Sequence, residues 1–136
     1  MDAFERYELR LSGGAVHETV VFMLFEDNDR CLLRCEYRNR TIENTATDFF
    51  QALCDLRDVL AKDGLTPICY GASLNVFPSG MARDMGLGLK AYKLAKGRHA
   101  KMEDLVEIFA EGPDIVLASV DAQEQFFRDW LVTPRS

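Results

Sequence analysis

The sequence predicts one α+β domain over residues 1–136, in which two principal helices pack on a mainly antiparallel sheet. Short runs that alternate apolar and polar residues recur in the first forty positions, and this is the period of half-buried strands. Two later segments repeat their apolar residues every three or four positions, as surface helices do. At 48% apolar residues, the chain can bury a core without disulfides or metals.

The first third of the chain predicts an N-terminal three-stranded meander. Residues 7–11 alternate apolar with charged side chains, and glycines 13 and 14 supply a turn. Residues 19–25 are apolar at nearly every position, as expected of a central strand covered on both faces. An Asp-Asn-Asp turn at residues 27–29 leads to the third strand, residues 31–37.

Residues 45–62 predict the first principal helix. Its apolar stripe consists of Phe49, Leu53, Leu56 and Leu60. Their spacings of four, three and four place one apolar face on a sheet. Thr45 or Thr47 is expected to cap the N-terminus, with Asp48 stabilising the first turn, and Gly64 is expected to end the helix.

The second half of the chain predicts shorter elements. Residues 66–70 read as a strand, and residues 78–86 read as a helical turn that starts near Ser79 and ends at Gly86. Residues 89–94 and 105–109 are expected to pair as antiparallel C-terminal strands.

The second principal helix is expected to begin at about Asp121, which forms a capping-box-like pair with Glu124. Phe126, Phe127, Trp130 and Leu131 cluster on one face of this helix. Trp130 is therefore expected to pack in the core.

The composition favours a cytoplasmic protein without a membrane segment. The N-terminus lacks the apolar core of a secretory signal, and the longest apolar run, residues 20–25, is far shorter than the roughly 20 residues that cross a bilayer. Thiols should then stay reduced. The four cysteines are Cys31, Cys35, Cys54 and Cys69. They lack CxxC pairs and neighbouring histidines, so we expect packing residues and neither a metal nor a cofactor.

Charge is unevenly distributed along the chain. Residues 83–101 hold six basic residues and one acidic residue, a net charge of +5, so a total of −6 leaves −11 to the remainder. An acidic body argues against nucleic-acid binding, because neutralising phosphates dominates that affinity. It favours steering towards a basic partner, although acidity also simply keeps proteins soluble.

No set of residues assembles a reaction centre. The glycine-rich residues 80–88 follow neither the GxxxxGK[ST] nor the GxGxxG pattern of phosphate-binding loops. Neither His17 nor His99 has a serine, cysteine or aspartate at a spacing that would place it alongside. We therefore predict no catalytic residue, and a binding protein rather than an enzyme.

Candidate binding residues lie on the acidic helix face and in the irregular segment 69–94, the kind of segment that often carries binding groups. They are Asp55, Asp58, Tyr70, Asn75, Phe77, Arg83 and Asp84. Phe77 is interleaved with Met81 and Met85, and such side chains recur at adaptable contact surfaces. The same three side chains would equally suit a core plug, and the pattern alone does not separate the two.

The run NVFPSGMARDMGLGLKAYKL, the strand VEIF and the closing SVDAQEQFFRDWL together resemble small cytosolic immunity proteins encoded beside bacterial polymorphic toxins. The resemblance covers the chain from Cys69 onward. It implies a stoichiometric inhibitor that blocks the active site or substrate path of a cognate toxin. Many such toxins are basic and attack nucleic acids, so an acidic inhibitor would be steered towards them.

The alternative is a small ligand-binding domain or enzyme whose 70–88 loop holds an anionic small molecule. Tyr70, Ser79, Arg83 and Asp84 would line the pocket, with Arg83 on the anion. This function requires a concave, partly apolar pocket beside the loop. Self-association through a sheet edge is compatible with either function.

Overall fold

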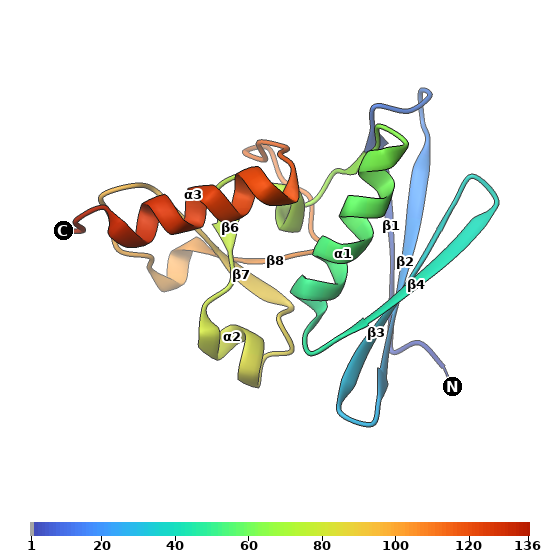
Figure 1. Cartoon of the computed structure of the whole chain (residues 1–136), viewed down its shortest axis with the longest axis horizontal. Helices are drawn as coiled ribbons and strands as arrows, with labels where there is room; N and C mark the ends of the chain where they lie inside the picture. Colours follow the sequence, from blue (N-terminus) through green and yellow to red (C-terminus); the bar gives the residue numbers. More distant parts are fainter. Residues whose placement is uncertain (1) are drawn as a thin grey trace.

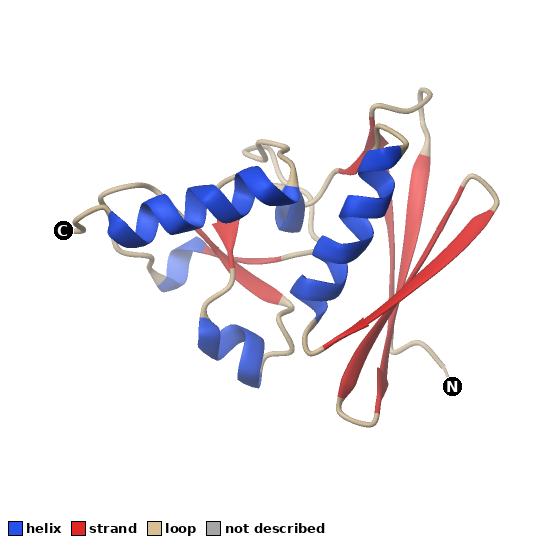
Figure 2. Cartoon of the chain, viewed as in Figure 1, coloured by secondary structure: helices blue, strands red, loops and turns tan. Residues whose placement is uncertain are grey.

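The computed structural model describes residues 2–136, which form two antiparallel sheets and three α-helices (Figures 1 and 2). The larger sheet has the order β4-β3-β2-β1-β5 and comprises β1 (Glu5–Ser12), β2 (Thr19–Asp27), β3 (Arg30–Tyr37), β4 (Arg40–Ala46) and β5 (Thr66–Pro67). The smaller sheet comprises β6 (Val76–Phe77), β7 (Lys90–Lys93) and β8 (Leu105–Glu107). The helices are α1 (Phe49–Lys62), α2 (Gly80–Met85) and α3 (Val120–Val132), with 3-10 turns η1 (Tyr70–Ala72) and η2 (Met102–Asp104). The α+β, sheet-dominated fold class is confirmed.

The N-terminal meander has four strands, so the prediction of three was wrong. The missed strand β4 exposes Thr41, Glu43 and Thr45, and it lies at the edge of the sheet, where strands carry charged and polar residues. A tight turn with positive φ at Arg38 and Asn39 joins it to β3. The pattern hid β4 because its inward face consists of Ile42, Asn44 and Ala46, of which one is polar, so the alternation is weak.

The extra strand moves the start of α1. The N-cap is Asp48, whose side chain accepts a hydrogen bond from the Gln51 amide at 2.8 Å, and neither Thr45 nor Thr47 caps the helix. The predicted end is confirmed, because Gly64 has a φ of +73° just beyond the last turn.

The main core lies between the larger sheet and α1. Val20, Phe22 and Leu24 of β2 are fully buried beneath the helix, whereas Val21 and Met23 on the other face are only half-buried. The expectation that this strand is covered on both faces was therefore wrong. In Figure 1, α1 lies between the larger and the smaller sheet, and Phe109, beyond β8, also stacks on Tyr7 of β1.

The second principal helix packs on the smaller sheet and against α1 (Figure 1). The α3 residue Phe127 stacks on Phe77 of β6 with ring centroids 4.0 Å apart. Ser119 caps the helix in place of Asp121, since its Oγ accepts from the Ala122 amide. Trp130 is half-buried at the periphery, where its Nε1 donates to the Arg98 carbonyl, so the prediction of a core tryptophan was wrong.

Several short elements follow the predictions. The helical turn α2 begins after the cap Ser79 and ends at Gly86, and β7 pairs antiparallel with β8. The predicted strand at residues 66–70 is shorter, because only Thr66–Pro67 pairs with β1 before the chain turns into η1.

Candidate functional site

The predicted binding residues fall in three separate places. Phe77, Arg83 and Asp84 lie on β6 and α2, Tyr70 lies in η1 with Asn75 just after it, and Asp55 and Asp58 lie on α1. The structure therefore brings together pairs of these residues and not the whole set.

Arg83 and Phe77 belong to a packed junction between α1, α2 and α3, and both also line a pocket of ≈ 230 Å³ beside it. The Arg83 guanidinium lies 5.1 Å from the Phe50 ring centroid and 5.3 Å from that of Phe77, and its Nη1 is 3.5 Å from the Asp48 carboxylate. Phe77 also packs edge-on against Phe50. Arg83 is thus held by two aromatic faces and a carboxylate, while its neighbour Asp84 is exposed.

Asn75 lines a polar pocket of ≈ 240 Å³ together with Lys93 and Asp114, and Tyr70 lies outside the lining but contacts Asp114. The Tyr70 hydroxyl donates to Asp114 Oδ1 at 2.6 Å, and Lys93 Nζ lies 3.1 Å from Asp114 Oδ2. These bonds raise the pKa of Tyr70 and of Lys93 and lower the pKa of Asp114. All three shifts move away from neutrality, whereas an efficient general acid or base titrates near the working pH.

The acidic face of α1 is split between two environments. Asp55 is half-buried and accepts a hydrogen bond from Gln51 Nε2 at 3.0 Å. Asp58 is exposed and lines a small pocket beside Arg57. The Asp58 carboxylate is therefore open to solvent, whereas that of Asp55 is partly covered and already hydrogen-bonded.

The largest hollow beside the 70–88 loop is a groove of ≈ 490 Å³ between α2 and the smaller sheet. We call it the methionine groove, and it is lined by Ser79, Met81, Ala82, Met85, Gly86, Leu89, Lys90, Tyr92, Met102 and Leu105. Met81, Met85 and Met102 are 72%, 81% and 74% exposed, and Lys90 is the one charged lining residue. In contrast to these methionines, Phe77 is half-buried in the packed junction. Phe77 therefore packs as a core plug would, whereas Met81 and Met85 are exposed as a contact surface would be.

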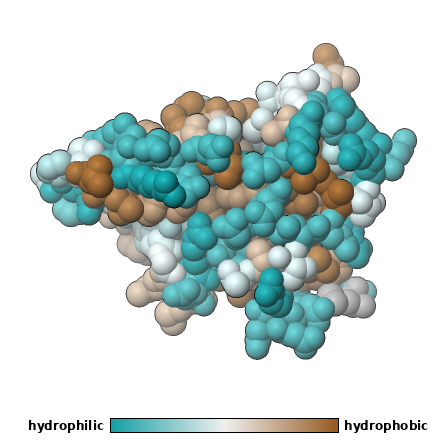
Figure 3. Space-filling view, viewed as in Figure 1, coloured by the Kyte–Doolittle hydropathy of each residue, from teal (hydrophilic) through white to brown (hydrophobic). Residues whose placement is uncertain are grey.

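A second exposed apolar patch lies on α3. Leu131 and Val132 are exposed at the C-terminal end of α3, where Figure 3 shows a hydrophobic spot in an otherwise mostly hydrophilic helix surface. The methionine groove gathers three exposed methionines around one hollow, so it is the stronger candidate contact surface.

The four cysteine thiols lack the exposure and the lowered pKa of a catalytic nucleophile. All four cysteines are buried and free, and burial raises the pKa of Cys35 to about 12 and that of Cys31, Cys54 and Cys69 to about 11. A nucleophilic cysteine is instead exposed with a lowered pKa. Within residues 2–136, no cluster of three or more histidine, cysteine, aspartate or glutamate side chains could hold a metal ion.

The sequence reasoning missed a buried polar network formed by Arg57 of α1 and Gln123 of α3. Arg57 Nη1 donates to Gln123 Oε1 at 2.7 Å, and Gln123 Nε2 lies within 3.0 Å of the carbonyls of Gly71, Ser73 and Val76. The helical spacing of the sequence places both residues on apolar, and therefore buried, helix faces. Arg57 falls four residues after Leu53 on the apolar stripe of α1, and Gln123 falls three, four and seven residues before the aromatic face of α3.

Comparison with known proteins adds no family. No protein-family model matches the chain, and no curated protein is significantly similar to it. Over residues 2–136, none of the helices combines the length and the hydrophobicity that crossing a membrane requires.

Proposed function

We propose that this chain is a non-enzymatic cytoplasmic binding protein, an immunity protein that neutralises a cognate bacterial toxin by stoichiometric binding. The observation that carries the proposal is the methionine groove. Three methionines more than 70% exposed around one hollow leave apolar surface in water that a partner would cover. Methionine side chains are flexible and polarizable, so they adapt to a partner surface.

The distribution of charge supports a basic partner. Outside residues 83–101 the chain carries an excess of acidic residues, which attracts a basic protein over several ångströms and speeds its association. Apolar contacts in the methionine groove would then provide affinity at short range. In this proposal the acidic surface attracts the partner, and the methionine groove binds it.

Co-purification and co-expression test this proposal. The tagged protein is expressed with the product of the adjacent open reading frame, and we expect a one-to-one complex and rescue of growth. The double variant Met81→Glu/Met85→Glu should weaken the complex by about 100-fold or more, because burying each methionine contributes about 1.5–3 kcal/mol and a buried carboxylate adds a penalty.

Val16→Glu is the matched control. Val16 is 85% exposed in the turn between β1 and β2, which Figure 1 places at the opposite end of the molecule from α2. The control should bind within about threefold of the unmodified chain. Absence of both a complex and rescue would refute the immunity function for that neighbour, and equal binding by both variants would exclude the methionine groove as the interface.

The methionine groove also favours a second candidate, a domain that binds a small amphiphilic anion. Its volume lies in the range of small-molecule pockets, and Lys90 is its one cation. Arg83 does not line the groove, so Lys90 replaces it as the residue expected to hold the anion. Decanoate should then raise the melting temperature of the unmodified chain but not that of Lys90→Gln, and no shift would refute this candidate.

A further inference from the structure

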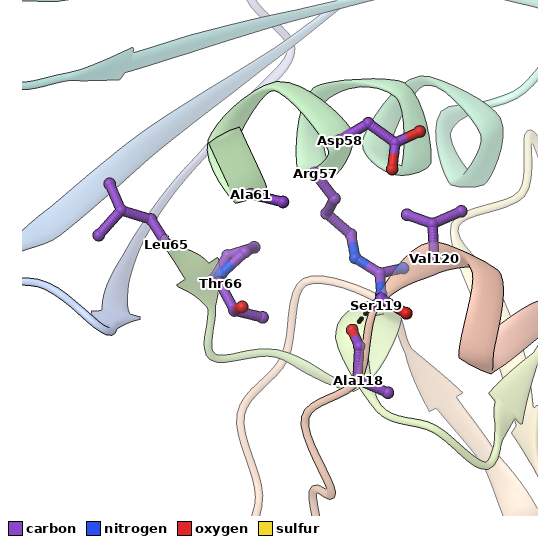
Figure 4. Close-up of a pocket in the computed structure, with 9 residues that line it drawn as sticks. Arg57, Asp58, Ala61, Leu65, Thr66, Ala118, Ser119 and Val120 are labelled. Atoms are coloured by element: carbon purple, nitrogen blue, oxygen red, sulfur yellow. Dashed lines mark hydrogen bonds between the residues drawn. The ribbon is translucent and has the colours of Figure 1, made fainter. Parts of the chain in front are cut away.

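Arg57 is a buried cation that has only neutral partners. Its side chain extends from α1 towards the start of α3 (Figure 4) and is 3% exposed. Nη1 donates to the Gly71 carbonyl at 2.9 Å and to Gln123 Oε1, and Nη2 donates to the Ala118 carbonyl at 2.8 Å. These acceptors satisfy part of the guanidinium but do not neutralise its charge.

No carboxylate within residues 2–136 forms an ion pair with Arg57, not even that of the adjacent Asp58. A buried charge is normally paired, because removing it from water costs several kcal/mol. Burial also lowers the pKa of the Arg57 side chain. A guanidinium has five N–H donors, so the observed bonds leave Nε–H and one Nη2–H without an acceptor in the described part of the chain.

Arg57 lines a small pocket that also contains the N-terminus of α3. The pocket has a volume of ≈ 40 Å³, and Ala61, Thr66, Ser119 and Val120 contribute to its wall (Figure 4). This volume exceeds the roughly 10–15 Å³ needed to hold one water molecule. The first turn of the 13-residue helix α3 adds the positive end of a helix dipole to the guanidinium charge, and Asp121 in that turn, which offsets part of the dipole, does not line the pocket.

We propose that the pocket between α1, β5 and the start of α3 binds a small anion of the size of formate or chloride, held by Arg57. Two independent features point to an anion: a cation without a carboxylate, and a helix N-terminus at the same cavity. Asp58 also lines the pocket, and its carboxylate raises the pKa of Arg57 against the larger opposing effect of burial, but its exposed side chain forms no ion pair with the guanidinium and leaves the N–H groups free for an anion. The site is separate from the methionine groove and does not depend on the proposed immunity function.

The first test places a carboxylate in the pocket from within the chain. Ala61 lies four residues after Arg57 on α1 and lines the pocket, so a glutamate there can reach the guanidinium. A negative charge in the last turn of a helix is otherwise unfavourable. We therefore expect Ala61→Glu to melt about 3–5 °C above the isosteric control Ala61→Gln, the opposite of what the helix dipole alone would cause.

The second test adds the anion itself. Sodium formate and sodium chloride are titrated to about 0.1 M at constant ionic strength, balanced with sodium benzenesulfonate, whose ring exceeds the pocket. We expect formate or chloride to raise the melting temperature of the unmodified chain by about 3 °C, and the response to disappear in Ala61→Glu. Arg57→Met should also lose it, and if that variant does not fold, Ala61→Glu carries the test. Equal shifts with all three salts would overturn the proposal.

Discussion

Replacing Gln123 by leucine tests whether the buried polar network joins α3 to the rest of the fold. Gln123 is 1% exposed and contacts three main-chain carbonyls and the Arg57 guanidinium. Leucine has a similar size, so Gln123→Leu removes the hydrogen bonds without opening a large cavity. Arg57 then loses a charge-assisted acceptor, and the carbonyls of Gly71, Ser73 and Val76 lose the two N–H donors of the Gln123 amide that they share.

The magnitude follows from these contacts. A hydrogen bond to a charged group contributes about 1.5–3 kcal/mol and a neutral one about 0.5–1.5 kcal/mol. The carbonyls of Gly71 and Ser73 keep a second donor, from Arg57 Nη1 and the Val76 amide, so their loss is partial. We expect Gln123→Leu to lower the free energy of unfolding by about 4 kcal/mol, a large share of the roughly 5–15 kcal/mol available to a domain.

Urea denaturation followed by circular dichroism measures this change. With a slope of about 1.5 kcal/mol per molar urea, the midpoint should fall by about 2–3 M. Gln125→Leu is the matched control, because Gln125 lies on the same helix, is exposed and donates only to Asp129 at 2.9 Å. The control should cost about 0.5 kcal/mol or less. A cost for Gln123→Leu within 1 kcal/mol of the control would refute the role assigned to the network.

Three further predictions concern the thiols, one glycine and the tyrosine–aspartate pair. Ellman's reagent at pH 8 should modify the four buried cysteines of the folded protein only after denaturant is added, and rapid labelling without it would contradict their burial. Gly88→Ala should cost about 2 kcal/mol or more in urea denaturation, since Gly88 has a φ of +68° and an added Cβ would lie 2.6 Å from Asp48 Oδ1; an unchanged midpoint would contradict this. Asp114→Asn should lower the pKa of Tyr70 in an ultraviolet titration, because its hydrogen bond raises that pKa. Because the folded pKa of Asp114 is lowered, its stabilising effect should be present at pH 7 and vanish as the pH falls through that pKa, so Asp114→Asn should match the unmodified chain in acid and be less stable at neutral pH.

Local patterns predicted the elements whose residues face both a core and solvent. The stripe from Phe49 to Leu60 identified α1, and Ser79 and Gly86 identified the ends of α2. Edge strand β4 was missed because one of its faces is polar and the other only partly apolar, so its alternation is weak. Trp130 was misplaced because an aromatic face on a helix indicates that the helix packs, but not how deeply.

The sequence by itself determined the α+β class, the caps and turns of the short elements and the uneven charge, because these depend on residues near each other in the chain. Only the tertiary structure decided that Phe77 is packed while Met81 and Met85 stay exposed, since that depends on the position of α3. It also brought Arg57 and Gln123, 66 residues apart, into one buried network. Contacts between distant segments depend on how the elements pack, and no local period records them.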